Sequence, residues 1–370
     1  MAKVVIIGAS IGGAALAFLL SKKVEVSVHE LKPRSEIGKK LCSNICTEPI
    51  AKMLYDWGFN PEEFIKTHFT KVKISTREKS VEFPINEFEI DRMKLVDTLI
   101  SAAEKNGAKF HFSSKFVDFH KEGEKFNALF DHDGKRNSEI ADSIVGADGA
   151  VSEFARKIGL WNKRKHFLYL QGKVERDRVR PEFVPDEHTQ HVFVGSWFGY
   201  YSYVYPTEGI LSLGLGDELG EKDIRSMFNV YLDYLGVKKV DLQGALIPIP
   251  QVVGMKKGLF LIGDAACDTK FSLGGIIPAL MAAEAVRDII LHKKYARYKA
   301  LKRKVKIHEM ATRVLRKLND KDYEELFEIM KKEKYQNLVA NRDRFNKKDL
   351  MTLASPELAL FSLKRLLRRK

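Results

Sequence analysis

The sequence predicts an α/β fold (α+β overall), in which a dinucleotide-binding domain is interrupted by an antiparallel sheet and followed by a helical C-terminal region. Three short segments with glycine and aspartate each follow an apolar run typical of a buried parallel strand. They are residues 8–13, 145–149 and 261–266. Segments of alternating apolar and polar residues, typical of a half-buried sheet, lie between them. After about residue 300 the chain is charged and has a helical pattern.

The first segment predicts a turn that binds phosphate. Val4 to Ile7 form an apolar strand, and Ala14 to Leu20 then predict a helix of small residues. A pyrophosphate at the start of such a helix meets free backbone N–H groups and the favourable end of the helix dipole. The candidate cofactor-binding residues in the turn are Gly8, Ser10, Ile11, Gly12 and Gly13. Ser10 replaces the middle glycine of the G-x-G-x-x-G pattern and is small enough to fit.

An acidic residue follows at the spacing expected of a ribose ligand. Residues 24–30 form the next predicted strand, and Glu30 lies about 20 residues after Gly8. A carboxylate there accepts hydrogen bonds from ribose hydroxyls and disfavours a 2′-phosphate. A glycine-rich turn by itself can serve packing alone, so the assignment depends on this acid and on the two later segments.

The later segments extend the site to the length of a flavin dinucleotide. Asp148 lies between the end of one strand and a helix predicted from Val151. Asp264 ends another strand, where its carboxylate can accept from ribityl hydroxyls, and the glycines that follow let the backbone approach a flavin ring. The candidates here are Asp148, Gly263, Asp264, Gly274, Gly275 and Ile276, to which we add Arg92, Phe116 and Cys42. FAD is therefore the expected cofactor.

This arrangement resembles the glutathione-reductase-like flavoproteins, which include aromatic hydroxylases and in which a substrate-binding sheet interrupts the dinucleotide (Rossmann) fold. The predicted FAD-binding domain is discontinuous and comprises residues 1–70, 88–160 and 245–300. The predicted antiparallel-sheet substrate domain comprises 71–87 and 161–244, and the C-terminal helical region comprises 301–370. Residues 214–220 have the wrong spacing for a second fingerprint, so no built-in nicotinamide domain is expected.

Composition favours a cytoplasmic protein. The 370 residues allow about two domains, and 45% hydrophobic with 30% charged residues is typical of a soluble globular chain. No apolar run is long enough to predict a spanning helix, and no signal-peptide pattern precedes the first strand. Three cysteines do not form a secreted disulfide framework, which favours a reducing compartment. His29, His166 and His191 are scattered and are interpreted as structural or surface residues, so no metal site is expected.

The net charge of +14 is compatible with three kinds of partner: nucleic acid, an anionic membrane surface or an anionic substrate. Leu360, Leu363 and Leu367 recur at helical spacing among basic residues near the C-terminus. Such a segment can lie at a lipid interface, or it can pack as an ordinary helix before a charged tail. No zinc spacing, helix-turn-helix or RNA-binding aromatic signature is present, so nucleic acid is not expected as a partner.

Two further segments indicate the chemistry. Cys42 and Cys46 follow the second predicted strand, in a loop that can reach a cofactor bound beyond the strand ends. A redox disulfide between them and a purely structural role both stay open. Tyr201, Tyr203 and Tyr205 alternate and would project to one face of a strand. Such a face suits a long hydrocarbon ligand, and it is also normal for the core of a sheet.

The tyrosine segment resembles the geranylgeranyl reductase family, flavoproteins that hydrogenate isoprenoid double bonds in lipids and chlorophyll precursors. The family pattern Y-x-W-x-F-P matches Tyr201-x-Tyr203-x-Tyr205-Pro206, with tyrosine in place of tryptophan and phenylalanine. The G-x-G that follows matches Gly214-x-Gly216.

Three other segments extend this resemblance over nearly the whole chain. The family's loop cysteine aligns with Cys42, where Ser43 replaces the usual glycine. The GD segment matches Gly263-Asp264, and the stretch from Leu318 to Asp322 resembles the archaeal members.

The resemblance implies an FAD-dependent oxidoreductase that acts on CH-CH bonds of a prenylated lipid. Cys42 would lie at the reacting face, as proton donor or in positioning, and Tyr201, Tyr203, Tyr205 and Pro206 would line the prenyl site. It also implies an external electron donor, NAD(P)H or reduced ferredoxin, and a peripheral position on the inner face of the membrane. The alternatives are an FAD-dependent aromatic hydroxylase or monooxygenase on the same scaffold and, more distantly, a non-enzymatic membrane- or nucleic-acid-binding flavoprotein. A halogenase is less expected because the W-x-W-x-I-P segment is absent.

Overall fold

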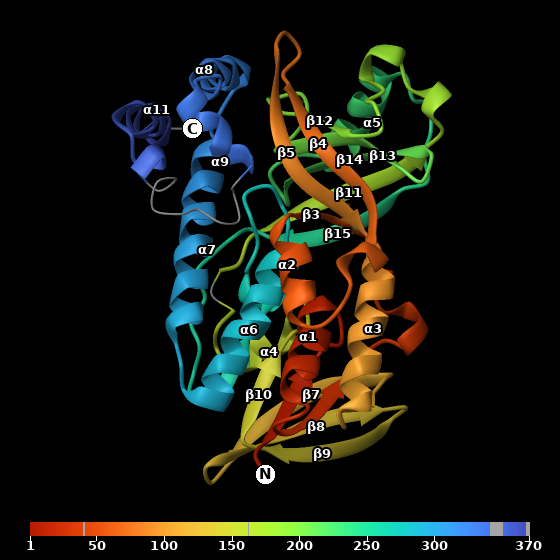
Figure 1. The fold of residues 1–370 in the computed structure, drawn as a ribbon, viewed down its shortest axis with the longest axis vertical. Helices are drawn as coiled ribbons and strands as arrows, with labels where there is room; N and C mark the ends of the chain where they lie inside the picture. Colours follow the sequence, from red (N-terminus) through yellow and green to blue (C-terminus); the bar gives the residue numbers. More distant parts are fainter. Residues whose placement is uncertain (40, 162, 341–350, 368–370) are drawn as a thin grey trace. The chain divides into compact units, whose positions relative to one another are not determined.

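The computed structural model describes residues 1–39, 41–161, 163–340 and 351–367 (Figure 1). The chain forms two compact units, each assembled from three stretches. The first unit comprises Met1–Lys40, Asp91–Arg164 and Pro248–Glu309. The second unit comprises Leu41–Ile90, Lys165–Ile247 and Met310–Lys370.

A five-stranded parallel sheet forms the centre of the first unit, in the order β16-β10-β1-β2-β6. Its strands are β1 (Lys3–Ile7), β2 (Glu25–His29), β6 (Lys109–His111), β10 (Ser143–Gly146) and β16 (Leu259–Leu261). The helices are α1 (Ile11–Leu20), α3 (Arg92–Lys105) and α6 (Ile276–His292), and α1 packs against both of the others. Most of α1 is buried, because its glycines and alanines take up little space. This confirms the predicted strand, turn and helix at the N-terminus.

The first unit also contains a three-stranded antiparallel sheet that the sequence analysis did not identify. It consists of β7 (Ser114–Glu122), β8 (Lys125–His132) and β9 (Lys135–Ala141), and its phenylalanines share a core with helix α4 (Glu153–Lys157). Two tight turns between alternating segments indicate this sheet in the sequence. Asp133-Gly134 is a hairpin dipeptide, and Gly134 has a φ of +78°, which glycine adopts without strain.

An eight-stranded sheet forms the second unit, in the order β15-β11-β14-β13-β12-β4-β5-β3. The strands are β3 (Ile45–Thr47), β4 (Ile65–Ser75), β5 (Ser80–Ile90), β11 (His166–Val174), β12 (Thr189–Phe193), β13 (Tyr201–Thr207), β14 (Ile210–Glu218) and β15 (Gln243–Pro248). Strands β12 and β4 pair in parallel, whereas the pairs from β11 through β13 are antiparallel.

The sequence predicted one alternating segment from Lys71 to Phe83, but the structure has a hairpin there. The turn between β4 and β5 falls at residues 76–79, where the Lys79 N–H donates to the Thr76 hydroxyl at 3.1 Å. Most of residues 41–70 also lies with this sheet, whereas the predicted boundaries placed that stretch in the FAD-binding domain. The physical reason is that β3 and β4 pair with β5, for example Cys46 with Phe88.

Helix α5 (Ile224–Leu235) covers one face of the eight-stranded sheet. Asp223 caps its start by accepting from the Ser226 N–H, and Gly236 ends it with a φ of +78°. Phe228 and Tyr231 of this helix pack in a core with buried aliphatic residues of β13 and β14. The alternate residues of these strands therefore point to the opposite face, where the predicted tyrosines lie.

The remaining elements are helical. Helix α7 (Ala296–Leu315) begins in the first unit, and α8 (Asp320–Met330), α9 (Glu333–Ala340) and α11 (Pro356–Leu366) belong to the second, as does α2 (Pro49–Asp56). Short 3-10 helices lie at Arg34–Glu36, Pro61–Glu63, Arg176–Arg178, Pro181–Phe183 and Gly263–Ala266. Within the described residues, no helix combines the length and apolar character needed to cross a membrane.

Candidate functional site

The glycine turn after β1 has the geometry of a phosphate-binding turn. Gly8 has a φ of +103°, and its N–H donates to the His29 carbonyl at 2.7 Å. A Cβ atom would lie 2.4 Å from the Ala147 carbonyl oxygen at Gly8 and 1.9 Å from the Gly8 oxygen at Gly13. No side chain caps the start of α1 at Ser10, and no acidic residue lies in its first turn. The start of this helix therefore suits an anion.

Glu30 lies beside this turn, as the spacing predicts. Its two carboxylate oxygens accept from the Ala9 N–H at 2.8 Å and from the Lys32 N–H at 2.9 Å. The carboxylate is thus tied to the backbone of the glycine turn at the end of β2. A ribose contact by this group stays a prediction.

A second helix start without a side-chain cap lies at α6. Gly275 is its N-cap residue, and its first turn contains no acidic residue. A Cβ atom on Gly275 would lie 3.1 Å from Asp264 Oδ1, and one on Gly274 would lie 2.5 Å from Lys270 Cε. The described residues of the first unit therefore include uncapped helix starts at Ile11, four residues after β1 ends, and at Ile276, which follows β16 after a longer loop. This is what a long dinucleotide with several polar parts requires.

Three other candidate cofactor residues have contacts that the sequence did not reveal. Asp148 accepts from the Ser152 hydroxyl at 2.6 Å and from the Phe154 N–H at 3.0 Å, and burial raises the pKa of its carboxyl. Asp148 thus holds the start of α4. The Arg92 guanidinium donates to the Gly38 carbonyl at 2.7 Å. The Phe116 ring packs against Phe154 in the core, so a cofactor contact there would involve its backbone.

The cysteine loop lies in the second unit. Cys42 is half-buried, and its sulfur accepts from the Asn44 N–H at 3.3 Å. Cys46 is buried on β3. No disulfide joins these two cysteines in the described part of the chain. Lys40, which precedes the loop in the family pattern, lies outside the described residues.

The three tyrosines of β13 share one face of the sheet. The ring centroids of Tyr201 and Tyr203 are 6.4 Å apart, and those of Tyr203 and Tyr205 are 4.9 Å apart. The Tyr203 hydroxyl donates to Gln171 Oε1 at 2.7 Å, and the Tyr205 hydroxyl donates to the Ser43 carbonyl at 2.8 Å. We call this surface the tyrosine face. It contacts the loop that contains Cys42, because Ser43 follows Cys42 in the chain. Pro206 is buried next to it and pairs with Leu211.

Tyr169 is a member of the tyrosine face that the sequence analysis missed. Its ring stacks near Tyr203 at 5.8 Å, and a Cβ atom on Gly216 would lie 2.2 Å from the Tyr169 ring. The G-x-G of β14 therefore makes room for this ring. The buried Tyr169 hydroxyl has no hydrogen-bond partner among the described residues, and burial raises its pKa well above the ordinary value. The signal was the alternation of Phe167, Tyr169 and Gln171 along β11.

Two buried glutamates on β5 were also missed. Glu87 accepts from Gln190 Nε2 at 3.0 Å, and Glu89 accepts from the Thr207 hydroxyl at 2.7 Å. Burial raises the pKa of Glu89 above its ordinary value. Glu89 therefore places a titratable group beside the end of the tyrosine strand, because Thr207 is the last residue of β13.

His29, His111 and Glu139 form a cluster in the first unit that could hold a metal by residue type. The His29 Nε2 atom lies 3.2 Å from Glu139 Oε1, and the His111 Nε2 atom lies 3.6 Å from it. The two imidazole rings stack at 4.6 Å with 16° between their planes, so their nitrogen lone pairs do not converge. The Lys3 ammonium also lies 3.3 Å from Glu139 Oε2. We therefore interpret the cluster as an ion-pair network.

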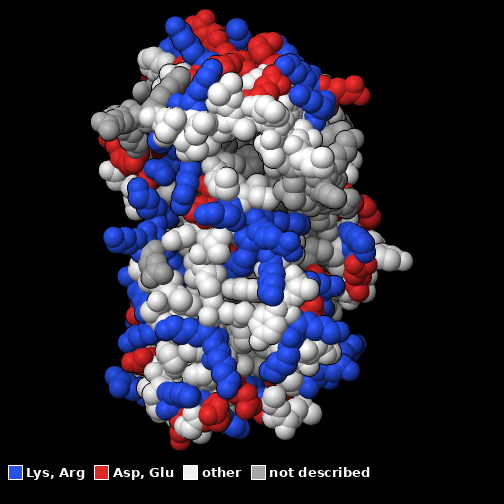
Figure 2. Space-filling model, turned by 90° about the vertical axis from the view of Figure 1, so that its left-hand side faces the viewer, with Lys and Arg blue, Asp and Glu red and all other residues white. Residues whose placement is uncertain are grey.

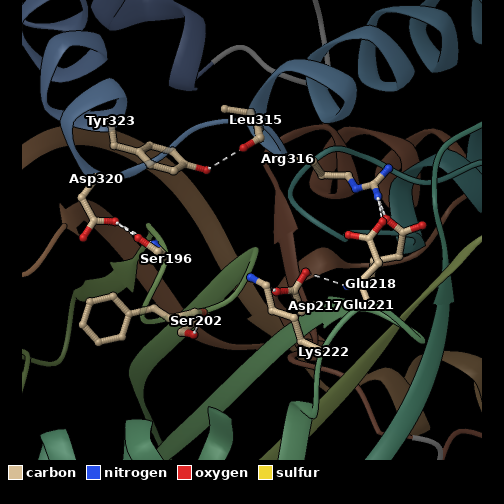
Figure 3. Close-up of polar contacts among 11 residues, drawn as sticks. Ser196, Ser202, Asp217, Glu218, Glu221, Lys222, Leu315, Arg316, Asp320 and Tyr323 are labelled. Carbon is tan, nitrogen blue, oxygen red and sulfur yellow. Dashed lines mark hydrogen bonds and ion pairs between the residues drawn. The ribbon is translucent and has the colours of Figure 1, made fainter. Parts of the chain in front are cut away.

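The C-terminal helices hold the loop that leads into β13. Asp320 accepts from both the N–H and the hydroxyl of Ser196 at 2.7 Å, and the ion pair of Arg316 with Glu221 spans 3.4 Å (Figure 3). Arg316 also forms an ion pair with Glu218 at the end of β14. The start of the tyrosine strand is thus anchored within the second unit by polar contacts.

Basic side chains gather on one side of α7. Lys299, Arg303, Lys306 and Arg313 are exposed and follow one another at intervals of four, three and seven residues, which places them on one side of the helix. Figure 2 shows the face of the molecule toward which α7 lies in Figure 1, and lysine and arginine side chains cover much of it. Part of the chain's excess of basic side chains therefore lies on one side of α7.

Comparisons with known proteins agree with the expectation from the sequence. No protein-family model matches the chain. It is 24% identical over 290 residues to a digeranylgeranylglycerophospholipid reductase of Methanocaldococcus jannaschii, a match that covers 74% of this chain and 72% of the relative.

Solved structures share the fold. A geranylgeranyl bacteriochlorophyll reductase-like protein of Thermoplasma acidophilum has a TM-score of 0.79 at 21% identity, over 99% of this chain and 100% of that one. The p-nitrophenol 4-monooxygenase of Pseudomonas putida has a TM-score of 0.70 at 14% identity, over 100% of both chains. The predicted α/β fold class is thus confirmed. Together, the comparisons confirm the predicted resemblance to the geranylgeranyl reductase family and support an FAD-dependent oxidoreductase.

Proposed function

We propose that the protein is an FAD-dependent reductase that saturates the isoprenoid (geranylgeranyl) double bonds of membrane lipids or their precursors. The observation that supports this most directly is the tyrosine face, tied to the cysteine loop by the hydrogen bond from Tyr205 to Ser43. It combines a wall of aromatic rings with a half-buried thiol. The similarity to the reductase of Methanocaldococcus jannaschii supports the same substrate class.

The residues of the first unit fit FAD. Gly8 and Gly13 leave room that any Cβ atom would fill, and the starts of α1 and α6 are not capped by side chains. The α1 turn would hold the pyrophosphate, Glu30 the ribose, and Asp264 with Gly274 and Gly275 the ribityl and ring end. Bound FAD would supply the two-electron reducing equivalent, after reduction by an external donor of the NAD(P)H or ferredoxin type.

The tyrosine face would bind and orient the prenyl chain. Burying hydrocarbon contributes about 0.8 kcal/mol per methylene, so contact with several isoprene units gives substantial binding energy. Unactivated alkenes resist reduction, and exclusion of water with tight orientation must therefore provide much of the rate. The raised pKa values of Tyr169 and Tyr205 keep these hydroxyls protonated. The face is thus neutral as well as aromatic, which suits a hydrocarbon.

Cys42 is the proposed source or director of the proton. Saturation of an alkene adds one hydrogen to each carbon, and the carbon that does not receive hydride must receive a proton. The Cys42 thiol is half-buried and held by the Asn44 N–H, whereas Cys46 is buried on β3. Cys42 is therefore the thiol of this loop that can approach a substrate.

The experiment that tests this function is anaerobic. The dithionite-reduced holoprotein is incubated with a geranylgeranylated glycerophospholipid, and the products are analysed by mass spectrometry. Stepwise gain of pairs of hydrogen atoms supports the prenyl reductase. An unchanged lipid with bound, reducible flavin contradicts it. Oxygen consumption in proportion to an aromatic substrate would instead identify a monooxygenase, the function of a structural neighbour.

A further inference from the structure

Helix α11 presents an apolar side to solvent. At about 100° per residue, the exposed residues of one continuous sector are all apolar. Leu360 and Leu363 are each 54% exposed, and Leu367 just after the helix is 72% exposed. We call this surface the leucine face; it comprises Pro356, Ala359, Leu360, Leu363, Leu366 and Leu367. Lys364 is exposed at its border.

Buried ion pairs fix the orientation of α11. The Arg365 side chain is 4% exposed, and its Nε donates to Asp322 Oδ1 at 3.1 Å. The same guanidinium forms an ion pair with Glu325 and lies 3.9 Å from the centroid of the Phe361 ring. Rotating the helix to bury its leucines would break these pairs and leave a buried charge without compensation. The outward direction of the leucines is therefore built into the second unit.

The chemistry of the leucine face favours one kind of occupant. Exposed aliphatic side chains over several turns mark an interaction surface, and leucine is suited to the acyl boundary of a bilayer. The nearby carboxylates are neutralised, because Glu328 pairs with Lys331 at 2.8 Å and Glu357 pairs with Lys334 at 3.5 Å and also with Lys332. The chain as a whole has a net charge of +14, which is complementary to anionic lipid.

We propose that the leucine face is an interfacial anchor, which inserts into the headgroup region of an anionic bilayer. Such a helix lies in the plane of the membrane and binds through apolar burial together with electrostatic attraction. The inference deepens the proposed function by naming the surface through which the enzyme would reach a membrane lipid. It rests on that function for the identity of the lipid, whereas vesicle binding itself needs no turnover.

The test uses the full-length, FAD-loaded protein and vesicles of phosphatidylcholine with or without phosphatidylglycerol. The variant Leu360→Gln/Leu363→Gln/Leu367→Gln changes only exposed side chains, so the fold is retained. The matched control is Leu219→Gln/Val230→Gln, which removes two exposed apolar side chains elsewhere on the second unit. In co-sedimentation, the wild type and the control should bind anionic vesicles, and the triple variant should bind at least about tenfold more weakly.

Two outcomes overturn the proposal. One is vesicle binding by the triple variant equal to that of the wild type. The other is a wild-type protein that does not bind vesicles but self-associates in light scattering. If the triple variant loses this self-association, the occupant of the leucine face is a second copy of the chain. Turnover of lipid dispersed in detergent distinguishes the proposed membrane anchor from the proposed reductase activity. A triple variant that is active in detergent but not on vesicles supports the anchor, whereas an inactive wild type that still binds vesicles contradicts only the proposed reductase.

Discussion

Tyr205 and Ser43 join the central strand of the tyrosine face to the cysteine loop. The Tyr205 hydroxyl donates to the Ser43 carbonyl at 2.8 Å, across more than a hundred residues of sequence. Burial raises the pKa of Tyr205 well above its ordinary value, so the hydroxyl keeps the proton that it donates. The neighbouring Tyr203 donates to Gln171 instead. Of these two hydrogen bonds, the one that reaches the cysteine loop is therefore the bond from Tyr205.

Replacing Tyr205 with phenylalanine should loosen the cysteine loop. The lost hydrogen bond should lower the free energy of unfolding by about 0.5–1.5 kcal/mol. A displaced thiol should slow alkene reduction by about 10- to 100-fold, because catalysis is sensitive to misplacement of about 1 Å. Alkylation of Cys42, measured by mass spectrometry of its peptide, should become faster.

Tyr203→Phe is the matched control for this change. It also removes one buried tyrosine hydrogen bond, but that bond goes to Gln171 and not to the loop. The alkylation rate of Cys42 should therefore stay at the wild-type value. Equal alkylation rates in Tyr205→Phe and the wild type would show that the loop does not depend on this hydrogen bond.

Replacing Cys42 with alanine should leave flavin bound and slow the chemical step. A positioned proton donor typically contributes about 100- to 10,000-fold to a rate, so single-turnover oxidation of the reduced flavin by the lipid should slow by that order. Cys46→Ala removes a buried thiol of the same stretch and should change this rate far less. Wild-type single-turnover rates in Cys42→Ala would remove the thiol from the mechanism.

The sequence predicted the first unit's turn well because its constraints are local. Gly8 and Gly13 must be glycine for steric reasons within the turn, and Glu30 follows at a fixed spacing. Tyr169 was missed because its place depends on pairing between β11 and β14, which sets its ring over Gly214 and Gly216. Such register is not readable from one strand alone.

Glu87 and Glu89 show another limit of sequence patterns. Alternation placed them on the buried face of β5, where apolar residues are expected. Their partners, Gln190 and Thr207, come from strands more than a hundred residues away. Buried acids of this kind are satisfied by tertiary hydrogen bonds, so only the folded sheet explains them.

Gly216→Ala should destabilise the second unit. The new Cβ atom would lie 2.2 Å from the Tyr169 ring, so the ring or the strand must shift. Overpacking of this kind costs about 1–3 kcal/mol of the free energy of unfolding, measured in urea. Gly254→Ala is the control, because a Cβ atom there meets nothing within 4 Å. The combined loss in Gly216→Ala/Tyr169→Ala should be smaller than the sum of the two single losses, because the clash needs the ring, and strictly additive effects would show that the two residues do not interact.

Gly13→Ala should abolish FAD retention, whereas Gly12→Ala should preserve it. A Cβ atom at Gly13 would lie 1.9 Å from the Gly8 carbonyl oxygen, so the turn must open. At Gly12 the nearest atoms lie at 3.5 Å, an ordinary contact. Both changes replace a glycine in the same helix with alanine, which separates turn geometry from helix propensity. The measurement is the flavin-to-protein absorbance ratio after purification, and equal ratios in the two variants would contradict the assigned turn.

Protonation of Glu139 should lower the free energy of unfolding of the first unit at acidic pH. Burial opposes ionisation of its carboxyl, but the hydrogen bond and charge of His29, with Ser27 and Lys3, outweigh burial and lower the pKa to about 2. Because the folded pKa lies below the ordinary value of 4.5, the ionised carboxylate stabilises the fold above pH 4.5, and this stability is lost as the pH falls toward 2.

Glu139→Gln should therefore lower the melting temperature at neutral pH, and its difference from the wild type should shrink through the window from pH 4.5 to about 2. Circular dichroism melts over this range measure the effect. The control is Glu124→Gln, which changes a glutamate whose side chain is 85% exposed and whose ion pair with Lys257 faces water. Such a pair contributes little, so its melting temperature should follow the wild type at every pH. A constant difference between Glu139→Gln and the wild type across the window would show that the network stabilises through packing, since only the ionised carboxylate gives a difference that depends on pH.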